Sequence, residues 1–304
     1  MMRRFSFILL CAGLVAPAAW AGQAGKSPVK VFILVGQSNM QGKGSVDQLK
    51  ALATAPDTKA VYGHLLDRNG QWLVRDDVWI WYMGRKGGLT VGYGSPADQR
   101  FGPELQFGHL VGDALDNQVL LLKIAWGGKS LAKDFRPPSS GGEVGPFYKE
   151  TLQHITDVLA NLGKELPDYD GKGYEIAGLV WFQGWNDRIN QAFNDAYETN
   201  LANFIRDIRK DLKLPALPIV IGETGQGGVD EKHPRALSLM RHQAAVAAMD
   251  EFKASVRFAE TKRFYKDAPK CDGGYHFFGN AENFYNIGNA MGKAMLELLP
   301  ARRP

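Results

Sequence analysis

The strongest limit on the fold of this chain is its alternation of short apolar segments with longer amphipathic ones. Five segments are short, apolar, rich in β-branched residues and followed by turn residues, as buried parallel strands are: Val29–Val35, Val119–Ala125, Ile176–Phe182, Pro218–Gly222 and Ser255–Ala259. Five others carry apolar residues at helical spacing: Pro103–Leu115, Tyr148–Leu162, Asn190–Leu212, Arg235–Phe252 and Ala281–Leu299. This alternation predicts an α/β fold in which helices cover both faces of a five-stranded parallel sheet.

Two segments interrupt the alternation. Asp67–Gly102 is rich in Gly, Trp and Tyr, and Phe135–Gly145 is rich in Pro, Gly and Ser. Connections of this length are uncommon inside a compact domain and are usually functional or disordered. Their aromatic content favours ordered loops, and we expect residues 22–304 to form a single domain.

The first residues have the layout of a secretory signal peptide. Arg3 and Arg4 precede an apolar run from Phe5 to Pro17, and Ala19 and Ala21 place small residues before a cleavage site that follows Ala21. The apolar run is too short to span a bilayer. We therefore expect export to the periplasm or to the outside of the cell; the sequence does not distinguish the two.

Composition excludes several classes of function. Arg3 and Arg4 leave with the signal peptide, so the 36 basic side chains fall to 34 against 32 acidic ones. This near balance lacks the excess of positive charge that is typical of a protein that binds nucleic acid. Cys271 is then the single cysteine, so neither an intrachain disulfide nor a cysteine-based metal site is expected. The chain also has no paired His spacing or dense carboxylate cluster, which argues against a metal-dependent hydrolase. We expect no metal and no cofactor.

The residues that follow the predicted strands carry the chemistry, because ligands of open parallel sheets bind beyond the carboxyl ends of the strands. After the first strand comes Ser38, preceded by Gly36 and followed by a helical transition. A serine in this position is exposed and surrounded by backbone N–H groups, as a nucleophile is. The spacing differs from the Gly-x-Ser-x-Gly elbow, and a helix cap is the alternative role for Ser38.

Two further strand ends supply hydrogen-bond donors. Gly127 and Gly128 follow the second strand, where they allow a close backbone approach to a ligand or simply form a tight turn. Asn186 follows the third strand within Gln183-Gly184-Trp185-Asn186-Asp187, and its carboxamide can donate to a developing oxyanion. A helix cap is again the alternative. Near the C-terminus, His276 lies in a Gly- and aromatic-rich loop, the setting of a general base with a carboxylate close by.

These motifs resemble those of a known superfamily. Gly36-Gln37-Ser38-Asn39-Met40, Gly127 and Gly184-Trp185-Asn186-Asp187 are similar to three signature blocks of the SGNH hydrolases, and they occur in the expected order. Phe101-Gly102-Pro103-Glu104 resembles a segment common in the carbohydrate esterase branch, which includes sialate O-acetylesterases and acetyl xylan esterases.

The resemblance implies a flavodoxin-like, three-layer α/β/α domain and a serine esterase. Ser38 would attack the acyl carbon, and His276 would take its proton and later donate it to the leaving sugar hydroxyl. The backbone N–H groups of Ser38 and Gly127, together with the side chain of Asn186, would hold the oxyanion.

The third catalytic residue departs from the pattern. The last SGNH block places Asp three residues before the His, where this chain has Gly273. Asp272 lies one residue further away, and the extra glycine allows the loop to bulge so that Asp272 reaches the ring. We predict Asp272 in this role, with Glu260 next, Glu223 after it, and a two-residue Ser-His dyad as a further alternative.

Aromatic side chains near the predicted site favour a sugar substrate, because sugar rings present C–H faces that lie well on flat apolar surfaces. The residues predicted to bind substrate are Gln37, Trp126, Gln183, Trp185 and Tyr275, with Tyr82 and Trp181 as further aromatic candidates. The predicted partner is acetylated carbohydrate, either a polysaccharide or a sialic-acid-like sugar. The alternative from another class is a carbohydrate-binding protein without turnover, favoured by the irregular acid position alone. The oligomeric state is not indicated.

Overall fold

The computed structural model describes residues 25–166 and 168–300 of the chain. The predicted signal peptide, residues 1–21, lies outside the described residues. Within the described part, no helix is both long enough and apolar enough to cross a membrane.

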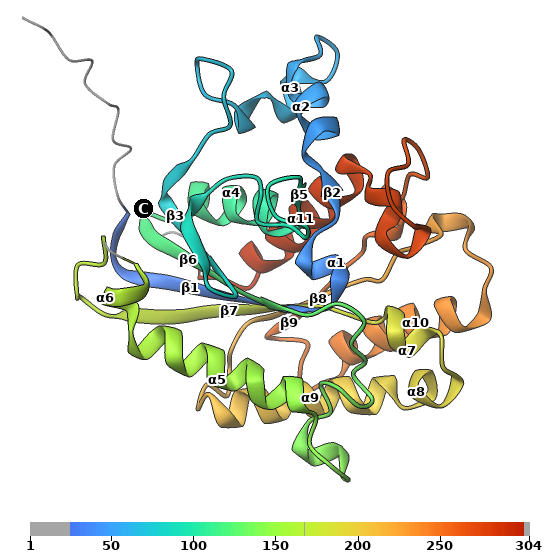
Figure 1. Ribbon diagram of the computed structural model, residues 1–304. Coiled ribbons are helices and arrows are strands. Elements are labelled where there is room, and N and C mark those ends of the chain that lie inside the picture. The colour runs from blue at the N-terminus through green and yellow to red at the C-terminus, as the bar shows by residue number, and fades with distance from the viewer. Residues whose placement is uncertain (1–24, 167, 301–304) are drawn as a thin grey trace, which may run out of the picture.

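A seven-stranded sheet forms the centre of the molecule (Figure 1). Its order is β4-β3-β6-β1-β7-β8-β9, and every neighbouring pair is parallel except β3 and β4. The strands are β1 (Lys26–Gly36), β3 (Arg75–Tyr82), β4 (Arg85–Leu89), β6 (Asn117–Ala125), β7 (Tyr174–Phe182), β8 (Ile219–Gly222) and β9 (Val256–Ala259). A separate two-stranded ladder pairs β2 (Gly44–Ser45) with β5 (Arg100–Phe101).

The predicted strands are all present, but the predicted number of five is wrong. They correspond to β6-β1-β7-β8-β9, which is the flavodoxin-like order 2-1-3-4-5. The two additional strands, β3 and β4, lie in the segment 67–102 that we interpreted as a loop. Three aromatic residues of that segment, Trp79, Trp81 and Tyr82, belong to the sheet and are buried in β3. Strand β4 contains two glycines and is held at the edge by backbone pairing with β3, which leaves no hydrophobic pattern to read.

Helices cover both faces of the sheet (Figure 1), and the five predicted helical segments are confirmed. One face carries α5 (Pro146–Ala160), α9 (Tyr197–Asp211) and α10 (Pro234–Ala248), and the other carries α2 (Val46–Thr54), α4 (Glu104–Ala114) and α11 (Ala281–Leu296). Each face has its own apolar core against the sheet. The predicted helix 190–212 is divided at Ala196 into α8 (Gln191–Asp195) and α9. The short helices are α1 (Ser38–Gln41), α3 (Lys59–Tyr62), α6 (Leu162–Glu165) and α7 (Trp185–Arg188).

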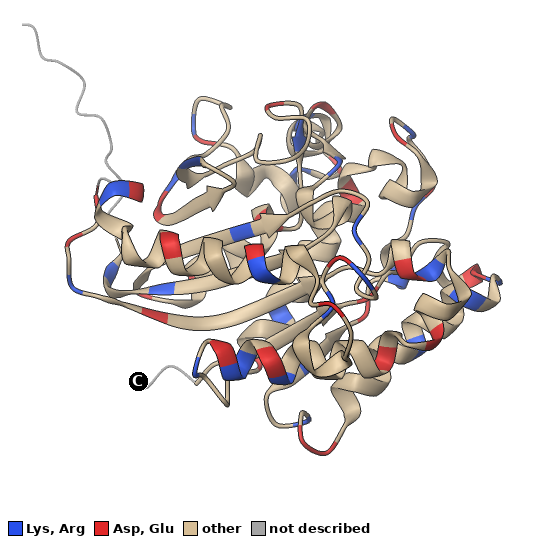
Figure 2. Ribbon diagram, turned by 60° about the horizontal axis from the view of Figure 1, so that its bottom comes forward, with Lys and Arg blue, Asp and Glu red and all other residues tan. Residues whose placement is uncertain are grey.

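Charged residues are spread over the helices, the loops and parts of the strands (Figure 2). Basic and acidic side chains are interspersed there along the ribbon (Figure 2). This mixture agrees with the near balance of 36 Lys and Arg against 32 Asp and Glu in the sequence.

Candidate active site

Three adjacent strands end together and position the first elements of the site. Gly36 at the end of β1 pairs with Ala125 of β6 on one side and with Phe182 of β7 on the other. After β1 the chain continues to strands on one side of the sheet, and after β7 it continues to strands on the opposite side. This change of direction is the topological switch point at which open α/β sheets bind ligands.

Ser38 begins the short helix α1 at this switch point. It follows β1 after a single intervening residue, Gln37, whose extended backbone turns the chain into the helix. The serine is 8% exposed, so it is nearly covered by its neighbours. The N–H groups of a first helical turn have no partner within the helix, which leaves donors around the hydroxyl.

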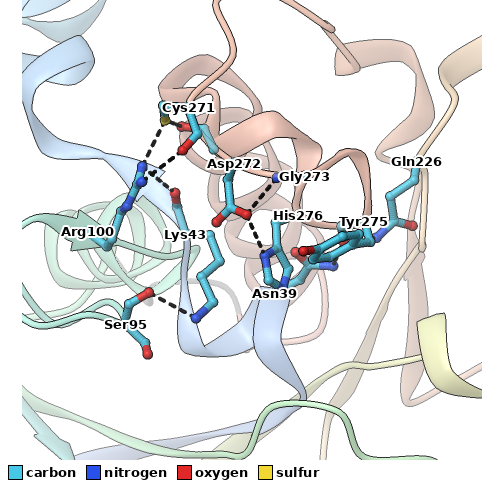
Figure 3. A network of polar contacts seen from close by, with 11 residues as sticks. Asn39, Lys43, Ser95, Arg100, Gln226, Cys271, Asp272, Gly273, Tyr275 and His276 are labelled. Atoms are coloured by element: carbon cyan, nitrogen blue, oxygen red, sulfur yellow. Dashed lines mark hydrogen bonds and ion pairs between the residues drawn. The ribbon is translucent and has the colours of Figure 1, made fainter.

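His276 has a carboxylate beside its ring. The Nδ1 atom of His276 lies 3.1 Å from Oδ1 of Asp272, and the same oxygen accepts a hydrogen bond of 2.6 Å from the backbone N–H of Gly273 (Figure 3). Both side chains are largely covered, with 15% of His276 and 22% of Asp272 exposed. The structure therefore brings the predicted Asp272 to the imidazole.

The two other predicted carboxylates have different partners. Glu223 is buried and accepts hydrogen bonds from the backbone N–H groups of Thr261 and Lys262. Glu260 forms an ion pair with the Lys262 ammonium at 3.3 Å. Glu223 follows β8 and Glu260 follows β9, and these contacts bind both carboxylates to the connection after β9.

A hydrogen bond between neighbouring loops joins the serine and histidine segments. Nδ2 of Asn39, next to Ser38, donates to the carbonyl oxygen of Tyr275, next to His276, over 3.1 Å (Figure 3). Gln226 donates to the same carbonyl over 3.4 Å. The Ser38 hydroxyl makes no hydrogen bond to the His276 ring within the described residues, and such contacts often tighten only when substrate binds.

The electrostatics around His276 favour its neutral form. Burial lowers the pKa of His276, the Asp272 carboxylate opposes that effect, and the positive charges of Lys43 and Arg100 add to it. A histidine with a lowered pKa is unprotonated at neutral pH and can accept a proton.

Lys43 and Arg100 are fixed in place beside this pair, and neither was anticipated from the sequence. Lys43 donates to the carbonyl oxygen of Ser95 over 2.9 Å. Arg100 donates to the carbonyl oxygens of Lys43 and Cys271 and to the Cys271 sulfur (Figure 3). Within residues 25–166 and 168–300, no three His, Cys, Asp or Glu side chains form a group that could hold a metal ion.

Two of the predicted oxyanion donors, Gly127 and Asn186, lie on the segments that follow β6 and β7. A Cβ atom built on Gly127 would lie 3.9 Å from the Cβ of Ser38, so the glycine backbone is immediately beside the serine. Nδ2 of Asn186 donates to the carbonyl oxygen of Gly128 over 3.1 Å. The structure thus brings the ends of β1, β6 and β7 together around one small volume.

Gln37 and Gln183, two of the predicted substrate-binding residues, are 2% and 1% exposed. Nε2 of Gln183 lies 2.6 Å from Oδ2 of Asp187 and 3.2 Å from Oε1 of Gln37. Asp187 also accepts hydrogen bonds from the backbone N–H groups of Leu131 and Ala132. These residues form a buried polar network behind Asn186. Burial raises the pKa of Asp187 to about 6, although the hydrogen bonds that the carboxyl group accepts oppose this effect.

The predicted aromatic residues separate into two groups. The rings of Trp185 and Tyr275 are 6.0 Å apart, and Tyr275 is 48% exposed. They flank the site because Trp185 precedes Asn186 and Tyr275 precedes His276. Trp126 instead packs against Phe135 and Phe147, and both Tyr82 and Trp181 are buried in the sheet.

An ion pair lies beside the segment that carries Ser38. Lys123 of β6 and Glu104 of α4 are both fully buried, with Nζ and Oε2 2.7 Å apart. The ammonium also donates to the carbonyl oxygens of Gln41, at the end of α1, and of Tyr93. Burial lowers the pKa of Lys123 to about 8. The sequence signal was a lysine inside an otherwise apolar strand, together with the Phe101-Gly102-Pro103-Glu104 segment.

A flavodoxin-like sheet with these blocks at its strand ends defines a hydrolase of the SGNH type. The chain belongs to the family described as carbohydrate esterase, sialic acid-specific acetylesterase, whose model matches residues 28–297. It is also 24% identical over 212 residues to a probable carbohydrate esterase of Arabidopsis thaliana, covering 66% of this chain and 71% of that one.

Solved structures show the same fold. The structure of the same Arabidopsis protein matches with a TM-score of 0.59 and 19% identity, over 89% of this chain and 99% of that chain. NanS matches with a TM-score of 0.56 and 15% identity, over 90% of this chain and 98% of that chain. A carbohydrate acetylesterase from Xanthomonas citri matches with a TM-score of 0.55 and 16% identity, over 88% of this chain and 56% of that chain.

Proposed function

We propose that this carbohydrate esterase removes O-acetyl groups from sugars through an acyl-enzyme on Ser38. The observation that carries the proposal is the pairing of His276 with Asp272 at 3.1 Å, on a loop bound directly to the serine segment through Asn39. Nucleophile, base and carboxylate are thereby held on adjoining segments, as this chemistry requires.

In the first step, the Ser38 hydroxyl oxygen attacks the acetyl carbonyl carbon, and Nε2 of His276 takes the hydroxyl proton. The negative charge that develops on the carbonyl oxygen is held by the backbone N–H groups of Ser38 and Gly127 and by Nδ2 of Asn186. When the tetrahedral intermediate collapses, the bond to the sugar oxygen breaks, and His276 returns the proton to that oxygen. The sugar leaves with a free hydroxyl group.

In the second step, water attacks the acetyl group on Ser38. His276 takes a proton from the water, the same donors hold the oxyanion, and the proton returns to the serine oxygen as acetate leaves. Asp272 stabilises the imidazolium in both steps, since it faces the ring nitrogen opposite to the reacting one. It also keeps the ring oriented.

Trp185 and Tyr275 are suited to contact the sugar. Their rings stand beside the predicted oxyanion donor and the base, and aromatic faces pack against the C–H faces of sugars. The guanidinium of Arg188 lies over the Trp185 ring at 4.5 Å and adds a charged group at the same edge. This arrangement supports a carbohydrate substrate and does not choose between acetylated xylan and an acetylated sialic acid.

The alternative of a binding protein without turnover rested on the irregular position of the acid. Asp272 lies at the imidazole despite that irregularity, so no observation on the described residues favours the alternative.

We also propose that the enzyme is exported, since Arg3, Arg4, the apolar run and Ala21 follow the order of a signal peptide. The intact mass of the protein recovered outside the cytoplasm should correspond to a chain that begins at Gly22. A recovered chain that still carries its first 21 residues would contradict cleavage at that position.

The test of the mechanism compares wild type with Ser38→Ala on 4-nitrophenyl acetate, acetylated xylan and 9-O-acetylated sialic acid. We expect the variant to lose about 10⁴-fold or more in kcat, the scale seen when a serine nucleophile is removed. Ser238→Ala, in α10, is the matched control and should retain full activity. Wild type without acetate release on any of the three, or a fully active Ser38→Ala, would refute the proposal.

A further inference from the structure

Gln37, the residue before Ser38, is surrounded by hydrogen-bonding groups, and some of these groups can act only as donors. Its Oε1 faces the backbone N–H groups of Gly184 and Asn186 at 3.3 and 3.4 Å. Its Nε2 donates to Oδ1 of Asn186 over 3.0 Å. Because backbone N–H groups only donate, they determine which end of the Gln37 carboxamide points toward them.

The orientation of Asn186 follows from that of Gln37. Nε2 of Gln37 needs an acceptor, so Asn186 must turn its Oδ1 toward it and its Nδ2 away. Nδ2 then donates to the carbonyl oxygen of Gly128, a group that only accepts. If both carboxamides were rotated by half a turn, Nε2 of Gln37 would face backbone N–H groups, which are also donors. Oδ1 of Asn186 would then face the carbonyl oxygen of Gly128, which is also an acceptor.

We propose that Gln37 is a positioning residue that holds the Asn186 carboxamide with Nδ2 toward the oxyanion. The inference rests on the proposed function, since it concerns the donor that Asn186 supplies to the reaction. One hydrogen of Nδ2 is used by Gly128, and the other remains available for a substrate oxygen. A carboxamide turned the other way would present an oxygen to the negative charge and oppose the reaction.

Burial makes this control effective. Gln37 is 2% exposed, so water does not compete for its carboxamide, and hydrogen bonds in such surroundings are costly to leave unmade. Gln183 supports the arrangement because its Nε2 lies 3.2 Å from Oε1 of Gln37 and is itself held by Asp187. The network therefore extends from the buried carboxylate to the reacting donor.

Gln37→Glu tests the proposal, because it conserves shape and replaces the single donor to Asn186 with a second acceptor. In its ionised form the new side chain still accepts from the backbone N–H groups but repels Oδ1 of Asn186. The loss of kcat should therefore grow as the pH rises, because burial favours a protonated carboxyl, which can donate to Asn186, at low pH. We expect kcat on 4-nitrophenyl acetate to fall by about 10²-fold with a much smaller change in KM, approaching the loss of one oxyanion donor.

A double-mutant cycle with Asn186→Ala distinguishes positioning from general damage to the structure. If Gln37 acts through the Asn186 carboxamide, Gln37→Glu should cost almost nothing further once that carboxamide is absent. An equal loss of kcat in both backgrounds would overturn the proposal. Unchanged kcat in the single variant Gln37→Glu would do the same.

Two more variants keep the test decisive. Gln118→Glu places a carboxylate at another buried glutamine, which lies at the amino end of β6 and bonds Gly25 and Asp76, and it should lower stability while retaining kcat. Gln37→Met removes the orienting groups without adding charge and serves if Gln37→Glu fails to fold. We expect a smaller loss for it, because Gly128 still orients Nδ2, and that loss should also vanish in the Asn186→Ala background.

Failure of the proposed function gives a different pattern. In that case wild type and Ser38→Ala would have the same activity, either none or full, whereas failure of the positioning role leaves an active, Ser38-dependent enzyme. The side-chain amide resonances of Asn186 supply a readout that does not depend on turnover, since Gln37→Glu should change its hydrogen-bonded partners. Resonances identical to those of wild type would contradict the positioning role.

Discussion

Asp272→Asn separates the charge of the carboxylate from its shape. Oδ1 of Asp272 accepts from both His276 Nδ1 and the N–H of Gly273, and the carboxamide oxygen of an asparagine can accept both hydrogen bonds in the same geometry. The Gly273 N–H donates only, so it directs the oxygen rather than the amide nitrogen toward this position. The substitution therefore removes the negative charge while keeping the ring oriented.

The expected loss follows from the energy of a hydrogen bond to a charged group. Such a bond contributes about 1.5–3 kcal/mol, and each ~1.4 kcal/mol is a factor of ten in rate. With 22% of the Asp272 side chain exposed, water screens part of the charge, which places the loss toward the lower end of the range. We expect kcat to fall by about tenfold to a hundredfold.

The pH profile should shift in a defined direction. The Asp272 carboxylate raises the pKa of His276 against the lowering caused by burial and by the nearby cations. Without that carboxylate the pKa falls further, and His276 remains neutral to a lower pH. The acidic limb of the kcat/KM profile should therefore move to lower pH in Asp272→Asn, so that the loss relative to wild type is smaller at pH 5 than at pH 8.

The assay is kcat/KM on 4-nitrophenyl acetate across this pH range for wild type, Asp272→Asn and Glu260→Gln. The last variant is the control, because Glu260 is 43% exposed and pairs with Lys262. Full activity and an unshifted profile in Asp272→Asn would refute the assignment of Asp272. A loss with a shifted acidic limb in Glu260→Gln or Glu223→Gln would transfer the role to that residue.

The buried ion pair beside α1 leads to a prediction about stability. Lys123→Met leaves the carboxylate of Glu104 buried without its cation and should lower the free energy of unfolding by about 3–5 kcal/mol, measured by urea denaturation. The double variant with Glu104→Gln should recover most of that loss, because no charge remains uncompensated. A double variant as unstable as the single one would show that the hydrogen bonds to Gln41 and Tyr93, rather than the ion pair, stabilise the region.

The fold was predictable where burial of a strand or helix produces a recognisable pattern of apolar residues along the sequence. The five segments from Val29 to Ala259 were recognisable because strands buried on both faces are continuously apolar. The segment 75–89 was not, since β3 begins with charged residues and β4 is charged and glycine-rich. A strand at the edge of a sheet depends on backbone pairing, and backbone pairing leaves no trace in the sequence.

The sequence predicted which motifs lie at the strand ends, but it did not predict how their side chains are oriented. Ser38, Gly127 and Asn186 follow three strands that end in register, so their approach could be expected from a parallel sheet. The role of Gln37 could not, because the direction of a carboxamide depends on groups from separate segments. Its burial beside the nucleophile is a three-dimensional property.

The approach of Asp272 to His276 depends on an unusual turn. Phe277 and Phe278 have φ values of 51° and 55°, a left-handed conformation that costs about 1–2 kcal/mol per residue outside glycine. The turn brings the carbonyl oxygen of Phe278 back to the N–H groups of Cys271 and Asp272, which closes the loop and directs Asp272 toward the ring.

Packing explains why Phe277 adopts this conformation. Phe277 is 1% exposed and lies against Phe182, at the end of β7, with ring centroids 6.4 Å apart. Burying such a ring stabilises the fold by about 1.5–3 kcal/mol, which offsets the backbone cost at that residue. The same aromatic contact fixes the histidine loop to the strand that precedes Asn186. This packing acts together with the hydrogen bond from Asn39 to Tyr275 to position the His276 loop, and it accounts for the strained backbone next to His276.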